Sequence, residues 1–274
     1  MASRKTPIAL TIAGSDSSGG AGIQADLKSF SAFGVYGATV ITALTAQNTM
    51  GVQAVSTVAP EFVAAQITSV LDDHAVDALK TGMLANTAII EVVAAALAKR
   101  PEIPLVVDPV MVATSGDPLL EPDAVDAFRR LLFPRAVLIT PNLPEAARLL
   151  GQPVATTEAE AEGQLRALGR LGAGAVLLKG GHGTSAEAVD LLLIGGHVRR
   201  FASPRIDTKN THGTGCTLSA AITALLAQGN PLETAVMEAK VYICHAIDAG
   251  RHLTIGRGHG PVDHLCGTRG NSPA

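Results

Sequence analysis

The sequence contains no tryptophan, and only six phenylalanines and two tyrosines supply aromatic rings. Single-stranded nucleic acids are commonly bound by stacking bases on aromatic side chains and by basic clusters that contact phosphates. Here 21 basic residues are balanced by 24 acidic ones, giving a formal net charge of -3, and no stretch is rich in lysine and arginine. These absences argue against nucleic acid as a partner.

Cysteine and long apolar runs are also scarce. The three cysteines, Cys216, Cys244 and Cys266, form no CxxC pair, and a sparse, odd count is typical of a reducing compartment. The apolar stretch 8–13 is too short for the core of a signal peptide, and no segment approaches the roughly 18–20 apolar residues of a membrane helix. We therefore expect a cytoplasmic protein that does not bind to membranes.

The chain has 274 residues, of which 47% are hydrophobic, so it can form one large core. No linker or repeat divides it, and we expect a single domain over 1–274 with a disordered tail at 270–274. Runs that are apolar on both faces predict buried parallel strands at 8–13, 38–44, 105–107, 136–139 and 175–178. Helical spacing and end signals predict helices at 60–74, 86–98, 157–171 and 214–227, and Gly195-Gly196 predicts a hairpin between 187–194 and 197–201. This alternation favours an α/β fold with helices on both faces of a mostly parallel sheet.

A glycine-rich turn, Thr211-His212-Gly213-Thr214-Gly215-Cys216-Thr217, precedes the helix expected at 214–227. Free backbone N–H groups and the positive end of the helix dipole bind anions, and glycine lets a phosphate approach the backbone closely. The spacing matches neither the phosphate loop with Gly-Lys-Ser/Thr nor the GxGxxG dinucleotide motif. The turn therefore indicates a phosphate site of another kind of kinase, with an ordinary loop and helix cap as the alternative.

A second glycine-rich loop, 14–22, follows the first expected strand. Loops at the carboxyl ends of parallel strands commonly bind ligands, and Asp16 and Asp26 can form hydrogen bonds with a polar substrate. An ordinary loop, with Asp16 capping the next helix, explains the same residues equally well.

Charged residues follow three other expected strands. Asp108 follows 105–107, Glu145 lies just beyond 136–139, and Lys179 follows 175–178. Kinases need Mg²⁺ to bridge nucleotide phosphates, and Mg²⁺ is often held by only one or two carboxylates. Asp108 and Glu145 are therefore candidate metal ligands, and Lys179 is a candidate partner for phosphate, although each also suits a turn, a first helical turn or a solvated loop. The parallel sheet brings these strand ends and both glycine-rich loops to one edge, which predicts a binding cleft there.

Several longer motifs resemble the hydroxymethylpyrimidine and hydroxymethylpyrimidine-phosphate kinases of thiamine biosynthesis, in the ribokinase-like superfamily. In chain order they read AGSDSSGGAGIQADLK, ITALTAQNT, VDPVM, SGDPLL, LITPNLPEA, LLKGGH and DTKNTHGTGCTLSAAI, with Asp207 in place of the family's first asparagine in the last. The resemblance runs from Ile8 to about His264. It implies a three-layer α/β/α fold, ATP and Mg²⁺ as cofactors, and two successive phosphorylations, first of 4-amino-5-hydroxymethyl-2-methylpyrimidine and then of its monophosphate. It also suggests a homodimer.

The resemblance assigns roles to individual positions. Gln47 falls where the family recognises the pyrimidine, and a carboxamide both donates and accepts hydrogen bonds. The other substrate-pocket positions are Asp26, Gly14, Met83 and Val110. The nucleotide positions are Asn142, Lys179, Thr211, His212, Gly213, Thr214 and Gly215, the catalytic positions are Cys216, Gly213, Gly215 and Lys179, and the metal positions are Glu145 and Asp108.

Three alternatives remain open at this point. Cys216 stands where most ribokinase-like enzymes have an aspartate base. A helix N-terminus favours its thiolate, whereas the charge of a nearby phosphate opposes it. Cys216 is therefore either the base or a residue that positions the reacting groups. A pyridoxine or pyridoxal kinase is the neighbouring enzyme class. A non-catalytic metabolite sensor with the same fold is the alternative outside enzymes.

Overall fold

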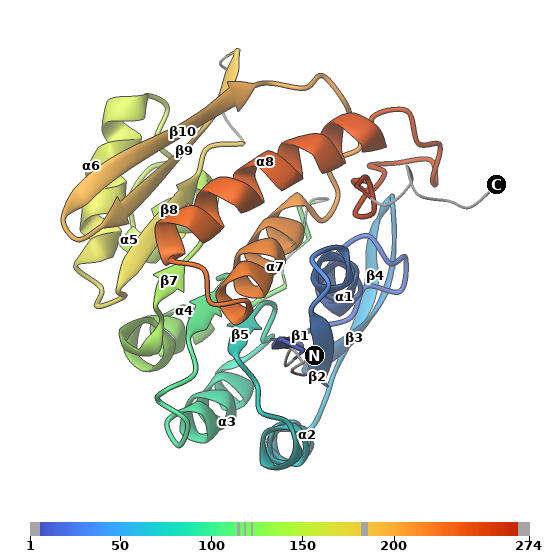
Figure 1. The fold of residues 1–274 in the computed structure, drawn as a ribbon, viewed down its shortest axis with the longest axis vertical. Coiled ribbons are helices and arrows are strands. Elements are labelled where there is room, and N and C mark those ends of the chain that lie inside the picture. The colour runs from blue at the N-terminus through green and yellow to red at the C-terminus, as the bar shows by residue number, and fades with distance from the viewer. Residues whose placement is uncertain (1–5, 114–115, 118, 122, 182–185, 268–274) are drawn as a thin grey trace, which may run out of the picture.

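The computed structural model describes residues 6–267 apart from 114–115, 118, 122 and 182–185; the tail 270–274, expected to be disordered, lies outside the described residues. An eight-stranded sheet runs through the molecule in the order β10-β9-β8-β7-β6-β5-β1-β2 (Figure 1). Its strands are β1 (Ile8–Ala13), β2 (Tyr36–Ile41), β5 (Ala78–Thr81), β6 (Leu105–Val107), β7 (Leu138–Ile139), β8 (Ala175–Lys179), β9 (Glu187–Ile194) and β10 (His197–Pro204). The six neighbouring strands β8, β7, β6, β5, β1 and β2 are parallel to one another. Strands β9 and β10 extend the sheet by antiparallel pairing.

Helices cover both faces of this sheet. One face carries α1 (Gly22–Ala32), α7 (Thr214–Ala227) and α8 (Leu232–Gly250), and the other carries α2 (Pro60–Asp73), α3 (Thr87–Leu97), α4 (Ala124–Ala127), α5 (Leu143–Leu150) and α6 (Glu158–Gly169). Consecutive strand residues point to opposite faces, so Val106 packs in the core with α7 and α8, whereas Val107 packs in the core with α2, α3 and α5. The expected three-layer α/β/α fold is confirmed. In the described part of the chain, no helix is both long enough and apolar enough to span a membrane.

The sequence predicts a single strand over 38–44, but the structure divides this apolar run between two strands. β2 ends at Ile41, and a separate hairpin of β3 (Ala43–Asn48) and β4 (Gly51–Thr57) begins two residues later. The break is fixed by Thr42, whose backbone N–H donates to Ala13 O at 3.1 Å and whose hydroxyl donates to Met83 O at 2.6 Å. These two bonds hold Thr42 at the carboxyl edge of the main sheet, from which the hairpin projects.

Two of the predicted helices begin at side-chain caps. Asn86 Oδ1 accepts the N–H of Ile89 at the start of α3, and Thr157 forms a reciprocal capping box with Glu160 in α6. Just beyond the end of α3, the guanidinium of Arg100 donates to Leu71 O at 2.8 Å and thereby satisfies a carbonyl near the end of α2.

A fully buried ion pair ties α1 to the parallel strands β1 and β5. Lys80 Nζ lies 2.6 Å from Asp26 Oδ1, and Thr11 donates to Asp26 Oδ2 at 2.6 Å. Both charged side chains have no exposed surface. Burial opposes the charge of Lys80, but Asp26 and the other acidic groups around it, Asp108 among them, together raise the pKa of Lys80 above its ordinary value.

Removing only the cation leaves an uncompensated buried carboxylate. We expect Lys80→Met to lower the free energy of unfolding by about 3–5 kcal/mol, measured by urea denaturation at pH 7. The matched control is Lys80→Met combined with Asp26→Asn, which removes both charges and recovers much of the loss. A single variant within about 1 kcal/mol of the wild type would contradict this account of the pair.

Candidate active site

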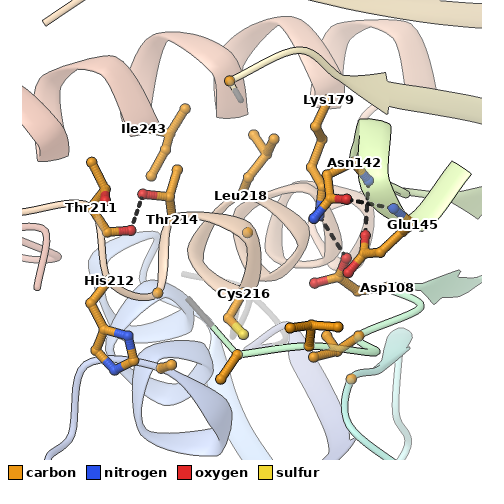
Figure 2. Close-up of a pocket in the computed structure, with 18 of the residues that line it drawn as sticks. Asp108, Asn142, Glu145, Lys179, Thr211, His212, Thr214, Cys216, Leu218 and Ile243 are labelled. Atoms are coloured by element: carbon orange, nitrogen blue, oxygen red, sulfur yellow. Dashed lines mark hydrogen bonds and ion pairs between the residues drawn. The ribbon is translucent and has the colours of Figure 1, made fainter. Parts of the chain in front are cut away.

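A cavity of about 560 Å³ opens along the carboxyl edge of the parallel strands, beside the N-terminus of α7 (Figure 2). Parallel α/β sheets typically bind ligands at this edge. The cavity collects every site residue that the sequence predicts: Gly14, Asp26, Gln47, Met83, Asp108, Val110, Asn142, Glu145, Lys179, Thr211, His212, Gly213, Thr214, Gly215 and Cys216. Their placement side by side makes a single site possible, and the role of each remains a prediction.

The glycine-rich turn forms the N-terminus of α7. Gly213 is the residue before the helix and has a left-handed backbone with φ of 80°. A Cβ at Gly213 would also lie only 1.8 Å from Gly20 O, so the turn packs directly on the N-terminal loop. Within the described ranges no acceptor binds the backbone N–H groups of Gly215 and Cys216, and both face the anion-favouring end of the helix dipole.

Asp108 and Lys179 form an ion pair beside this turn. Lys179 Nζ lies 2.8 Å from Asp108 Oδ1, which also accepts the hydroxyl of Thr140 at 2.9 Å, while Ser219 in α7 donates to Oδ2 at 3.1 Å. Burial opposes ionisation of Asp108, but Lys179 and then Lys80 hold its pKa below the ordinary value. Burial likewise opposes the charge of Lys179, and Asp108 and Glu145 raise its pKa above the ordinary value. Lys179 is therefore a fixed cation at the cavity wall.

Asn142 and Glu145 form a capping box at the start of α5. Asn142 Oδ1 accepts the N–H of Glu145, and Glu145 Oε2 accepts the N–H of Asn142, each at 2.8 Å. The ordinary role that the sequence allows for Glu145, an acid in the first turn of a helix, is thus realised. Both residues nevertheless line the cavity, where the side-chain amide of Asn142 remains available.

Asp108 and Glu145 suit a divalent cation. Burial raises the pKa of Glu145 to about 7, with Lys179 opposing the rise and the charge of Asp108 adding to it. A cation placed between the two carboxylates would offset their repulsion and favour the ionised form of Glu145. Mg²⁺ takes one or two carboxylates and completes its shell with water and phosphate oxygens, so these residues fit it.

Cys216 lies in the first turn of α7 and is only partly exposed to the cavity. Burial raises the pKa of its thiol to about 11; Lys80 opposes this, and the carboxylates of Asp26 and Asp108 add to it. The direction of this shift is opposite to the thiolate that the helix N-terminus favours in the sequence. At neutral pH Cys216 is therefore a thiol.

The opposite end of the cavity is built from the N-terminal loop, the hairpin and the chain after β5. A Cβ at Gly14 would lie 2.9 Å from Met83 Sδ, so a glycine there leaves room beside the thioether. Gln47 follows an irregularity in the β3–β4 pairing, and the hydroxyl of Thr45 lies 3.2 Å from its Oε1. No partner in the described part of the chain occupies Gln47 Nε2. Asp26 reaches the same end, but its two oxygens already bind Lys80 and Thr11.

Sequence reasoning misses two lysines at this cavity. One is Lys80 in β5. The signal that could have revealed it is a lysine that directly follows apolar residues, shortly before Gly82. Lys240 in α8 also lines the cavity, with Nζ 2.7 Å from Asp190 Oδ2 of β9. No local signal marks Lys240, because its partner is 50 residues away in the sequence.

Comparisons with known proteins agree with this geometry. A family model described as phosphomethylpyrimidine kinase matches residues 16–263. The hydroxymethylpyrimidine/phosphomethylpyrimidine kinase of Rhizobium meliloti is 56% identical over 260 residues, which cover 95% of this chain and 97% of that protein. An ADP complex of Bacillus subtilis pyridoxal kinase superposes with a TM-score of 0.89 and 39% identity, covering 96% of this chain and 98% of the other. Phosphomethylpyrimidine kinase from Clostridium difficile superposes with a TM-score of 0.78 and 44% identity, covering 89% and 100%.

The raised pKa of Cys216 predicts slow alkylation. With a pKa of about 11 the thiol has far less thiolate at neutral pH than an ordinary cysteine, and we expect iodoacetamide to react with it about 100-fold more slowly at pH 7.5. Peptide mass mapping of Cys216 against N-acetylcysteine as the control measures this, and the rate should keep rising with pH beyond 9. A plateau near pH 8 would contradict it.

Proposed function

The chain belongs to the phosphomethylpyrimidine kinase family, and on that premise we propose how its residues divide the work of the reaction. It is a hydroxymethylpyrimidine/phosphomethylpyrimidine kinase of thiamine biosynthesis. Such an enzyme transfers the γ-phosphoryl group of ATP first to the hydroxymethyl oxygen of the pyrimidine and then to the resulting monophosphate. Both transfers need one cleft in which an acceptor and the nucleotide meet.

The two ends of the cavity differ in chemical character, and this difference supports the assignment of residues. One end presents Gly14, Met83 and Gln47, whose Nε2 has no partner among the described residues, and these groups suit a flat ring with hydrogen-bonding edges. The other presents Lys179 and the N-terminus of α7, which suit phosphates. We assign the pyrimidine to the first end and the ATP phosphates to the second, with Val110 and Asp26 completing the pyrimidine pocket.

Phosphoryl transfer depends mainly on positioning and on stabilising charge. The acceptor oxygen forms a bond to the γ-phosphorus while the bond to the β-phosphate oxygen breaks, and ADP leaves. Lys179, held by Asp108, and the N–H groups of Gly215 and Cys216 stabilise the charge on the moving group. Asn142, Thr211, His212 and Thr214 line the nucleotide side of the same path.

Cys216 acts in this scheme as a contact that positions the acceptor rather than as a base. With a pKa of about 11 it carries its proton at neutral pH and has no capacity to accept another. The second acceptor is a phosphate monoester, which is already anionic because its second pKa is about 6. In the first step the hydroxyl proton leaves late, as a loose transition state allows, and passes to an oxygen of the transferred phosphoryl group or to water.

Mg²⁺ belongs to the same proposal. Asp108 and Glu145 would hold it, and it would supply positive charge to offset that of the nucleotide phosphates. Among the protein groups, Thr140 and Ser219 orient Asp108, and the capping box orients Glu145.

A homodimer and a cytoplasmic location complete the proposal. The β3–β4 hairpin exposes three large apolar side chains, Leu44, Met50 and Val55, which a second copy would cover. The three cysteines are unpaired, which suits a reducing compartment.

Pyridoxal is a second candidate substrate, because the fold superposes on a pyridoxal kinase with a TM-score of 0.89. Pyridoxal and hydroxymethylpyrimidine both carry a hydroxymethyl group on a nitrogen heterocycle. One carboxamide, that of Gln47, does not distinguish the two rings by itself.

An assay of turnover tests the function directly. We expect the purified protein with ATP and Mg²⁺ to convert hydroxymethylpyrimidine to the monophosphate and then the diphosphate, resolved by chromatography, with a lower kcat/KM for pyridoxal. Lys179→Met is the matched control and should lower kcat by about 10²–10³-fold, as loss of one charge-stabilising donor does. Equal or better turnover of pyridoxal, or no diphosphate, would overturn the substrate assignment.

A further inference from the structure

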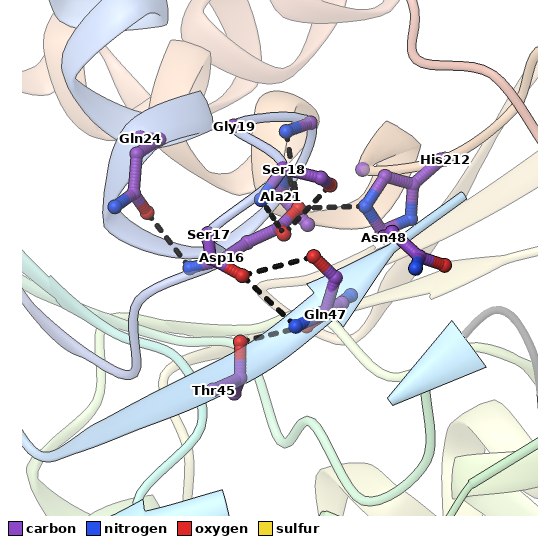
Figure 3. A network of polar contacts seen from close by, with 12 residues as sticks. Asp16, Ser17, Ser18, Gly19, Ala21, Gln24, Thr45, Gln47, Asn48 and His212 are labelled. Atoms are coloured by element: carbon purple, nitrogen blue, oxygen red, sulfur yellow. Dashed lines mark hydrogen bonds and ion pairs between the residues drawn. The ribbon is translucent and has the colours of Figure 1, made fainter. Parts of the chain in front are cut away.

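The carboxylate of Asp16 is the centre of a buried network in the N-terminal loop (Figure 3). Oδ1 accepts the backbone N–H and the hydroxyl of Ser18, at 2.8 and 2.7 Å. Oδ2 accepts the N–H groups of Gly20 and Ala21, at 3.0 and 2.8 Å. Only 2% of Asp16 is exposed, so four donors from its own loop replace the water that the charge has lost.

The fifth partner of this carboxylate comes from the other glycine-rich segment. His212 Nε2 lies 2.7 Å from Asp16 Oδ2, and the two side chains are both buried although they are 196 positions apart in the sequence. His212 directly precedes Gly213, the residue before α7. The two backbones also touch, because a Cβ at Gly213 would lie 1.8 Å from Gly20 O. The Asp16–His212 contact therefore joins the N-terminal loop to the phosphate-binding turn.

The same loop is joined to the strand that carries Gln47. The hydroxyl of Ser17 lies 2.9 Å from both the backbone O and the backbone N of Gln47. On its helix side, the backbone N–H of Asp16 donates to Gln24 Oε1 at 2.8 Å. Hydrogen bonds at both ends, joined by the covalent backbone between Ser17 and Asp16, thus connect the backbone of Gln47 to the turn at His212 (Figure 3).

We propose that Asp16 is a positioning residue that couples the two ends of the cleft through His212, so that pyrimidine and nucleotide each bind more tightly when the other is present. The proposal rests on the proposed function, which places the pyrimidine at Gln47 and the phosphates at the turn. Its physical basis is that a buried carboxylate with five donors resists separation of the groups it holds. A ligand that orders the loop therefore also orders the turn, and the coupling is reciprocal.

Isothermal titration measures this coupling as a ratio of dissociation constants. Hydroxymethylpyrimidine is titrated into the protein alone and into protein saturated with Mg²⁺ and the non-hydrolysable analogue AMP-PCP. We expect the analogue to lower the Kd of the wild type for the pyrimidine by about 10-fold, within the usual range of such couplings. In Asp16→Asn the ratio should fall below about 2-fold, because an amide offers one acceptor oxygen where the loop and His212 need two.

Ser18→Ala is the matched control. It removes one hydrogen bond to Asp16 inside the loop and leaves the contact with His212 intact, so its ratio should stay close to that of the wild type. If circular dichroism shows that Asp16→Asn is unfolded, His212→Leu replaces it. That variant keeps every bond within the loop and breaks the link to the turn, so it should also lose the coupling, measured at AMP-PCP concentrations that saturate the variant because His212 also lines the nucleotide side. His212→Gln, which retains a donor, should restore part of it.

Two results for the wild type and the link variants would overturn the proposal, and a third concerns the control Ser18→Ala. One is a wild type that binds both ligands independently, and the other is a folded Asp16→Asn or His212→Leu protein that keeps the full ratio. Failure of the proposed function looks different, because the wild type would then bind no hydroxymethylpyrimidine at all. A loss of coupling in Ser18→Ala equal to that in Asp16→Asn would also contradict it, since any damage to the loop would then suffice.

Discussion

The ion pair between Asp108 and Lys179 is the interaction on which the arrangement of the cleft depends. It joins the chain after β6 to the end of β8, and the hydroxyl of Ser219 attaches α7 to the same carboxylate. Because a buried charge without its partner costs several kcal/mol, the strands and the helix must keep these positions together. Even a side chain at Gly215 would meet Lys179 Nζ, at 3.2 Å. The positions of the groups at the phosphate end of the cleft are therefore set by the need to keep this ion pair together and buried.

Much of the fold could be predicted because its signals are local. β6 and α7 begin and end at the expected residues, since an apolar triplet before Asp108 and a glycine on each side of an alanine-rich run mark them. β5 escapes prediction because Lys80 interrupts its apolar pattern, and only the distant Asp26 makes a buried lysine tolerable. The break at Thr42 is likewise set by Ala13 and Met83, neither of which is a neighbour in the sequence.

The gathering of the site residues could be predicted from topology, since parallel strands end at one edge, but their electrostatics could not. The sequence places Cys216 at a helix N-terminus, yet its pKa depends on burial and on Lys80, Asp26 and Asp108, which come from other elements. The pairing of Asp16 with His212 could not be predicted from the sequence either, because Asp16 is explained by its own loop and His212 by its own turn, 196 positions away. The resemblance to a kinase family supplies the reaction and the expected roles of residues. The structure supplies the contacts that connect the two ends of the cleft.

The central claim is that one cleft holds the pyrimidine against the Gln47 end while its acceptor oxygen faces phosphates at the start of α7. A crystal structure with hydroxymethylpyrimidine, Mg²⁺ and AMP-PCP tests it most directly. We predict a hydroxymethyl oxygen about 3–3.5 Å from the γ-phosphorus, with Gln47 bound to the ring and Lys179 bound to the γ-phosphate. A pyrimidine seated beside Lys240, or a nucleotide whose phosphates lie away from Gly213–Cys216, would contradict the account.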